Sequence, residues 1–113
     1  PKSQKASSRI EKVYSYVLNN FRNPEISQAA LASELNMTSS SLCKFVKNMT
    51  RKTLFQLIME ARVNEACKLL VTSDKYISEI SYHSGFNNLS NFNRVFKRVM
   101  GATPADYRRS YHH

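Results

Sequence analysis

The stretch Ile77–Arg108, ISEISYHSGFNNLSNFNRVFKRVMGATPADYR, decides the fold, because it places helix signals on both sides of a glycine turn. Gly85 is the strongest turn signal in the chain, since glycine easily adopts the left-handed conformation that ends a helix. Asn88 predicts the next helix start, because its side chain can accept a hydrogen bond from an unpaired backbone N–H. A helix over about 78–84, a short turn and a helix over about 89–99 therefore make a helix-turn-helix.

The second of these helices has one apolar side and one basic side. Its apolar residues follow the spacing i, i+3, i+4, i+7, which predicts a buried stripe: Phe92, Val95, Phe96 and Val99. The opposite side carries Ser90, Arg94 and Lys97. Gly101 ends this helix, and Pro104 favours the first turn of another helix over about 104–110.

The same pattern occurs about fifty residues earlier. The apolar stripe there is Leu42, Phe45, Val46 and Met49, and the opposite face carries Ser40, Lys44 and Lys47. Matching pairs at an offset of 50 are Thr38/Asn88, Leu42/Phe92, Lys44/Arg94, Lys47/Lys97 and Thr53/Thr103. This duplication predicts a first helix-turn-helix with helices over about 28–35 and 39–48, capped by Ser27 and Thr38.

The remaining segments predict two further helices. One runs over about 9–21 and ends at Asn23-Pro24, and a long one over about 53–71 has no Gly or Pro inside it. We therefore predict an all-α fold of about seven helices, in which two helix-turn-helix subdomains are joined by a long linker helix. The expected division is a tail or linker at 1–8, a first subdomain at 9–52, a linker helix at 53–72 and a second subdomain at 73–113.

The charge balance favours a polyanionic partner. The chain has 17 Lys+Arg against 8 Asp+Glu, a net charge of +9, and both halves share the excess. The sequence has no apolar run long enough to predict a membrane span, and its N-terminus lacks the apolar segment of a signal peptide. A cytoplasmic protein is therefore expected.

Catalytic and metal-binding signals are weak. Cys43 and Cys67 are not in a Cys-x-x-Cys arrangement, so we expect reduced thiols and no zinc site. The sequence shows no Ser/His/Asp constellation, no Gly-rich phosphate loop and no HExxH motif. We accordingly expect no enzyme activity, no catalytic residue, no cofactor and no metal ligand.

Specific residues in the opening stretch resemble the signature region of the AraC/XylS family of bacterial transcription regulators. They are Ile77-x-x-Ile80, Gly85-Phe86, Phe92, Arg94, Phe96-Lys97, Gly101 and Pro104-x-x-Tyr107-Arg108. The resemblance covers about residues 9–109 and includes Arg62 in the linker helix. It implies two recognition helices that enter successive major grooves on one face of DNA. It also implies a sensory domain ahead of this segment.

The resemblance also carries roles onto individual residues. It implies base contacts by Ser40, Cys43, Lys44, Leu89, Ser90, Asn93 and Arg94. Arginine can pair with guanine and asparagine with adenine through two hydrogen bonds each. It implies phosphate contacts, which position the protein without reading sequence, by Ser27, Thr38, Lys47, Ser78, Asn88 and Lys97.

Several residues keep two interpretations. Cys43 is either a small buried thiol or a base contact, and Leu89 touches a thymine methyl or only covers the helix start. Arg62 pairs with a carboxylate between the subdomains, which we favour, or contacts phosphate. Arg108 and Arg109 contact phosphate or are solvated.

The first unit departs from the family pattern more than the second does. Val46 stands where an aromatic residue is usual, and Arg51 stands where glycine is usual. In the second unit, Ser81 replaces the usual alanine. The serines at 39–41 have little reach, so base reading by the first unit is expected to be the weaker.

The resulting hypothesis is sequence-specific binding of double-stranded promoter or operator DNA by a bacterial, nucleoid-associated transcription regulator. Expected partners of the whole protein are RNA polymerase and an effector or signal bound by the absent N-terminal domain, while the isolated domain is expected to be monomeric. The alternative is a protein-interaction adaptor on the same fold, with weak or no sequence-specific DNA binding.

Overall fold

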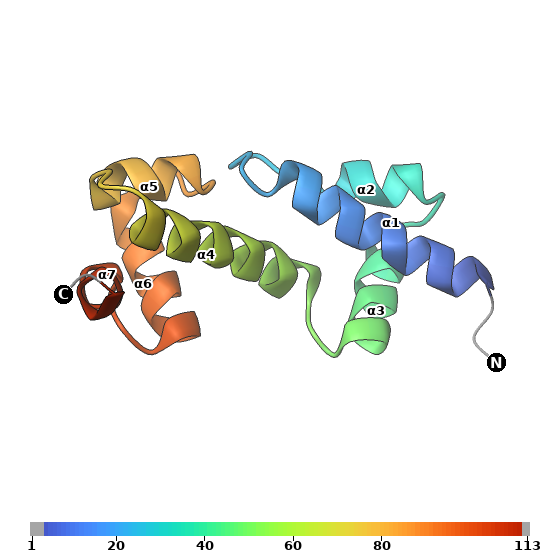
Figure 1. Cartoon of the computed structure of the whole chain (residues 1–113). Coiled ribbons are helices and arrows are strands. Elements are labelled where there is room, and N and C mark those ends of the chain that lie inside the picture. The colour runs from blue at the N-terminus through green and yellow to red at the C-terminus, as the bar shows by residue number, and fades with distance from the viewer. Residues whose placement is uncertain (1–3, 112–113) are drawn as a thin grey trace.

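A computed structural model describes residues 4–111, which form seven α-helices and no strand within that range (Figure 1). The helices are α1 (Gln4–Asn20), α2 (Gln28–Glu34), α3 (Ser39–Thr50), α4 (Leu54–Thr72), α5 (Ile77–His83), α6 (Leu89–Met100) and α7 (Pro104–Tyr111). The central helix α4 packs against α1 and α3 and also against α5, α6 and α7. The predicted all-α class is confirmed.

The largest difference from the predicted helices is at the N-terminus. α1 begins at Gln4 rather than near residue 9, so residues 4–8 of the predicted tail are helical, and residues 1–3 lie outside the described range. These first residues are polar or small and carry no apolar spacing, which is why the periodicity did not extend to them. α5 likewise begins at Ile77, one residue before the predicted start.

Most of the predicted apolar stripes are buried. Leu42 and Val46 of α3 and Phe92, Val95 and Phe96 of α6 are at most 2% exposed. The exceptions are Phe45 and Met49 of α3, which are only partly buried, and Val99 near the end of α6, which is 42% exposed. α3 and α6 therefore each keep one face in the core and leave the opposite face to solvent.

Arg62 is the one buried charged residue of the described core, with 6% of its surface exposed. Its Nε donates a hydrogen bond to the Phe21 carbonyl (2.7 Å) and its Nη2 donates one to the Asn23 carbonyl (3.0 Å). These carbonyls follow the end of α1, so Arg62 ties α4 to the α1–α2 turn. The favoured structural role is confirmed, but the partners are backbone carbonyls and not a carboxylate. Burial lowers the pKa of Arg62.

Gly85 packs against the same turn from the other half of the molecule. Its φ is +105°, and a Cβ there would lie 2.3 Å from the Phe21 carbonyl oxygen and 2.8 Å from Arg62 Nε. The Phe86 ring centroid is 5.6 Å from Arg62 Cζ. The turn after α1 and the turn after α5 thus meet beside α4, as Figure 1 shows. We call Phe21, Asn23, Arg62 and Gly85 the junction.

Arg108 repeats the arrangement of Arg62 in the second half. From α7, its Nε and Nη2 donate hydrogen bonds to the carbonyls of Leu70 and Ser73, each at 3.1 Å. Each of the two arginines therefore satisfies carbonyls at the end of an earlier helix, which otherwise lack partners. Arg108 is partly buried rather than solvated, whereas the neighbouring Arg109 forms an ion pair with Asp106.

Candidate nucleic-acid interface

The two helices expected to read DNA, α3 and α6, lie on the same side of α4 near its opposite ends (Figure 1). The molecule is elongated, with principal extents of 49 × 28 × 20 Å. Its long dimension exceeds the spacing of successive major grooves on one face of B-DNA, which is about 34 Å. The arrangement therefore allows both helices to approach one duplex face.

α3 presents its polar residues to solvent as predicted. Ser40, Cys43, Lys44 and Lys47 are all exposed. The exposure of Cys43 excludes the buried-thiol interpretation. Cys43, Lys44 and Lys47 also line one open groove together with Asn48 and Thr53, so the cationic groups lie beside the small polar ones.

α6 presents the second predicted set. Ser90, Asn93, Arg94 and Lys97 are exposed, and Leu89 is 38% exposed. Because part of Leu89 faces solvent, its side chain is accessible to a ligand as well as covering the helix start. The two faces thus differ in chemistry, with serine and lysine on α3 and asparagine and arginine on α6.

Asn91 is a residue that the sequence analysis missed. Its Oδ1 accepts a hydrogen bond from Arg94 Nη2 at 2.7 Å, and its backbone N–H donates one to Asn88 Oδ1 at 2.7 Å. The first turn of α6 therefore orients Arg94 before any ligand binds. Neighbouring helix positions three residues apart face each other, so the Asn91–Arg94 spacing was the available signal.

The predicted phosphate-contacting residues at helix starts are mostly caps. Ser27, Thr38 and Asn88 each accept a hydrogen bond from the backbone N–H three residues later, at 3.1, 3.0 and 2.7 Å. Ser27 is partly buried and the other two are exposed. Ser78 is exposed but is not a cap, because α5 starts at Ile77 and its cap is Tyr76. These side chains hold the helix starts whose free N–H groups suit anions.

Residues 4–111 offer neither a metal site nor a membrane-spanning helix. No group of three or more His, Cys, Asp or Glu side chains in that range could hold a metal ion. No helix in the same range combines the length and apolar character needed to cross a bilayer. Partial burial raises the pKa of the Cys67 thiol, which favours its neutral form.

Comparison with known proteins agrees with the fold. A family model described as a helix-turn-helix domain matches residues 31–110. The chain is 32% identical over 102 residues to an uncharacterised HTH-type transcriptional regulator from the cgkA 5' region of Pseudoalteromonas carrageenovora. That alignment covers 90% of this chain but 60% of the regulator, so the chain spans less than two thirds of its relative.

Solved structures share the same arrangement of helices. The C-terminal domain of AraT, a response regulator from Geobacillus stearothermophilus, has a TM-score of 0.85 at 24% identity, covering 96% of this chain and 86% of that one. The DNA-binding domain of AdpA, solved in complex with a target DNA, has a TM-score of 0.81 at 24% identity, covering 96% and 94%. With the family match, these findings show that the chain belongs to the AraC-type helix-turn-helix family, the DNA-binding domains of transcription regulators.

Proposed function

We propose that this domain reads double-stranded DNA by inserting α3 and α6 into successive major grooves on one face of the duplex. The observation that carries the proposal is the pair of exposed polar and basic faces on two helices that α4 holds on one side of the molecule. The net charge of +9 supports a polyanionic ligand.

The proposed contacts divide into two classes. Contacts to base edges are assigned to Ser40, Cys43, Lys44, Leu89, Ser90, Asn93 and Arg94, all of which are exposed. Contacts to phosphates are assigned to Ser27, Thr38, Lys47, Ser78, Asn88 and Lys97. Arg94 and Asn93 supply the two side chains best suited to discriminate bases, so α6 is the stronger reader.

The proposal extends to the organisation of the protein. We divide the chain into subdomains at 9–52 and 73–113 joined by 53–72. The reason is that α4 packs both against helices that precede it in the chain, α1 and α3, and against helices that follow it, α5, α6 and α7. We propose that the full-length regulator also has a sensory domain that binds an effector or signal. We further propose that it contacts RNA polymerase and that it is located in the cytoplasm. The isolated domain is proposed to be monomeric.

Selection from random duplexes tests the function. We expect a motif with two halves about 10 bp apart, one helical turn, because that spacing presents successive grooves to α3 and α6. Affinity for this duplex, measured by anisotropy, should fall with salt. Lys47 and Lys97 alone predict about a tenfold loss between about 50 and 200 mM salt. An affinity that stays flat across this range would exclude the proposal.

The alternative function, a protein-interaction adaptor, is favoured by one feature. The start of α3 offers only the short serines at 39–41, and each of them is exposed. A variant at Arg94 separates the two ideas, because it removes the best base-reading group without touching the core.

Replacing Arg94 with alanine should weaken binding to the selected duplex by about 1–3 kcal/mol and relax the preference at one base of one half-site. The reason is the loss of a side chain that can make two hydrogen bonds to guanine. Anisotropy titrations against duplexes altered at each position measure both effects. Lys12→Ala, at an exposed position of α1, is the matched control and should bind as the parent does. Unchanged affinity in Arg94→Ala favours the adaptor.

A further inference from the structure

Arg51 ends α3 in a backbone conformation that favours glycine. Its φ is 65° and its N–H donates a hydrogen bond to the Lys47 carbonyl at 2.9 Å. Gly101 occupies the corresponding place after α6, with φ 75° and the same bond to Lys97 at 2.8 Å. A side chain with a Cβ is strained in this left-handed region, so the first unit carries a steric cost that the second avoids.

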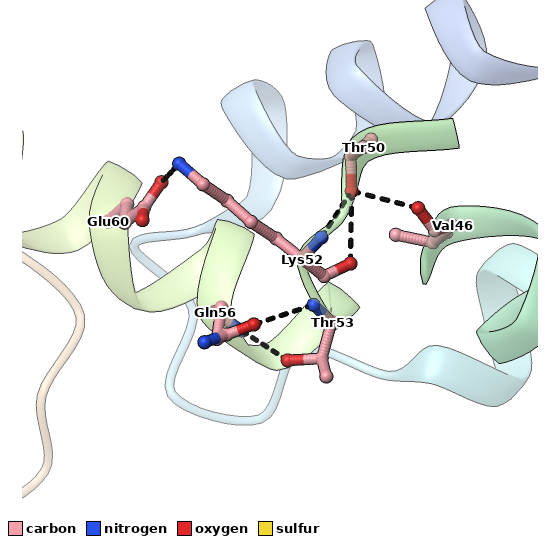
Figure 2. Close-up of polar contacts among 6 residues, drawn as sticks. All are labelled: Val46, Thr50, Lys52, Thr53, Gln56 and Glu60. Carbon is pink, nitrogen blue, oxygen red and sulfur yellow. Dashed lines mark hydrogen bonds and ion pairs between the residues drawn. The ribbon is translucent and has the colours of Figure 1, made fainter. Parts of the chain in front are cut away.

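The surrounding corner prevents Arg51 from relaxing. The Thr50 hydroxyl lies 2.8 Å from the Val46 carbonyl and accepts a hydrogen bond from the Lys52 N–H at 3.1 Å (Figure 2). On the other side, Thr53 and Gln56 form a reciprocal capping box with bonds of 2.8 and 3.0 Å. Because the residues before and after Arg51 are held, its conformation is imposed by the α3–α4 corner.

No contact of the Arg51 side chain within the described residues explains why an arginine is kept at this strained position. The side chain is exposed, and within residues 4–111 its guanidinium has no hydrogen bond or ion pair. Arg51 comes directly after the last residue of α3, four residues beyond Lys47. Arg51 also lines an open groove with Lys47 and Asn48. Its charge is therefore available to a ligand on the recognition face.

We propose that Arg51 contacts a DNA phosphate beyond the end of α3, and that the strained backbone is retained for this charge. The inference rests on the proposed function, since it places the duplex against α3. It makes the first unit chiefly a backbone clamp, in which Lys47 and Arg51 compensate for the short serines at the start of the helix. The second unit has Gly101 at the same place and combines the phosphate contact of Lys97 with base contacts by Asn93 and Arg94.

Two variants test this contact, Arg51→Gly and Arg51→Asn, because both residues tolerate the left-handed conformation and neither is charged. We expect the melting temperature to rise by about 4–8 °C for the glycine variant. Affinity for the selected duplex should fall, and the slope of log K against log salt should become shallower by about 0.9. The affinity gap to the parent should then shrink about 3.5-fold between about 50 and 200 mM salt.

Stability and affinity are expected to move in opposite directions, which a purely structural role of Arg51 would not produce. Arg51→Lys keeps both charge and strain and should match the parent in slope and melting temperature. Asn36→Gly relieves the other left-handed non-glycine residue of the described chain, φ 55°, and should leave the salt slope unchanged.

The outcomes separate this inference from the proposed function. A parent protein whose binding ignores salt overturns the function itself. If the parent shows the expected salt dependence but Arg51→Gly and Arg51→Asn keep its slope, the Arg51 contact is refuted. A fall in affinity at unchanged slope also refutes it, as does the absence of any gain in stability from Arg51→Gly.

Discussion

Replacing Gly85 with alanine is expected to lower the free energy of unfolding by about 2–5 kcal/mol. Two costs combine, since the new side chain must adopt φ +105° and its Cβ would lie 2.3 Å from the Phe21 carbonyl oxygen and 2.8 Å from Arg62 Nε. The nearest atom belongs to backbone, so the two halves of the molecule must move apart at the junction. Urea unfolding followed by far-UV circular dichroism measures the loss.

Gly101→Ala is the matched control for this prediction. Gly101 has φ +75°, but nothing lies within 4 Å of a Cβ built there. It should therefore cost only the conformational part, about 1–2 kcal/mol. The difference between the two alanine variants isolates the contact at the junction. Equal losses for Gly85→Ala and Gly101→Ala would show that the turns after α1 and α5 are not in close contact.

Replacing Arg62 with alanine is expected to cost about 3–5 kcal/mol of unfolding free energy. The variant loses hydrogen bonds of 2.7 and 3.0 Å to the carbonyls of Phe21 and Asn23. The Phe21 carbonyl is then left buried without a donor, and the Phe86 ring loses its contact with the guanidinium. Chemical denaturation at several salt concentrations should show a loss that salt hardly changes, because the site is shielded from solvent.

Three further variants test whether the loss of stability in Arg62→Ala comes from the two hydrogen bonds of the guanidinium. Arg62→Lys keeps the charge but lacks the planar fork that reaches two carbonyls, so most of the loss should remain. Arg108→Ala removes the arginine with the similar arrangement in the second half of the molecule. It should lower the free energy of unfolding by less, because Arg108 is only partly buried. Arg22→Ala removes an exposed partner of Glu65 and should cost at most about 1 kcal/mol. An Arg62→Ala loss no larger than that of Arg22→Ala would contradict the junction.

Local patterns predicted the recognition helices because their causes are local. The apolar spacing of Phe92, Val95 and Phe96 requires only that one helix face be buried, and Asn88 caps a helix that starts one residue later. The exposure of the polar faces follows from the same spacing. α1 shows a case in which such patterns do not predict the helix start. Its first turn, from Gln4, is helical although the sequence there has no apolar periodicity.

Contacts between distant residues were beyond the reach of these patterns. Arg62 was predicted to be structural, but its partners lie 41 and 39 residues away, and helical spacing does not say which carbonyls face it. Arg108 was assigned to phosphate or solvent, whereas it binds carbonyls 38 and 35 residues away. Asn91 is a different case, because its spacing of three residues from Arg94 is visible in the sequence, whereas the direction in which the Arg94 side chain turns is not.

The sequence alone specifies two helix-turn-helix units with basic outer faces, since periodicity and caps act over a few residues. The tertiary structure decides how the units are held together, because burial of Arg62 and the close approach at Gly85 depend on segments far apart in the chain. The tertiary structure also shows the strained backbone at Arg51. The sequence shows there only an arginine at a position where glycine is usual. A backbone angle is set by the corner around it, and that corner exists only when α3 and α4 have packed.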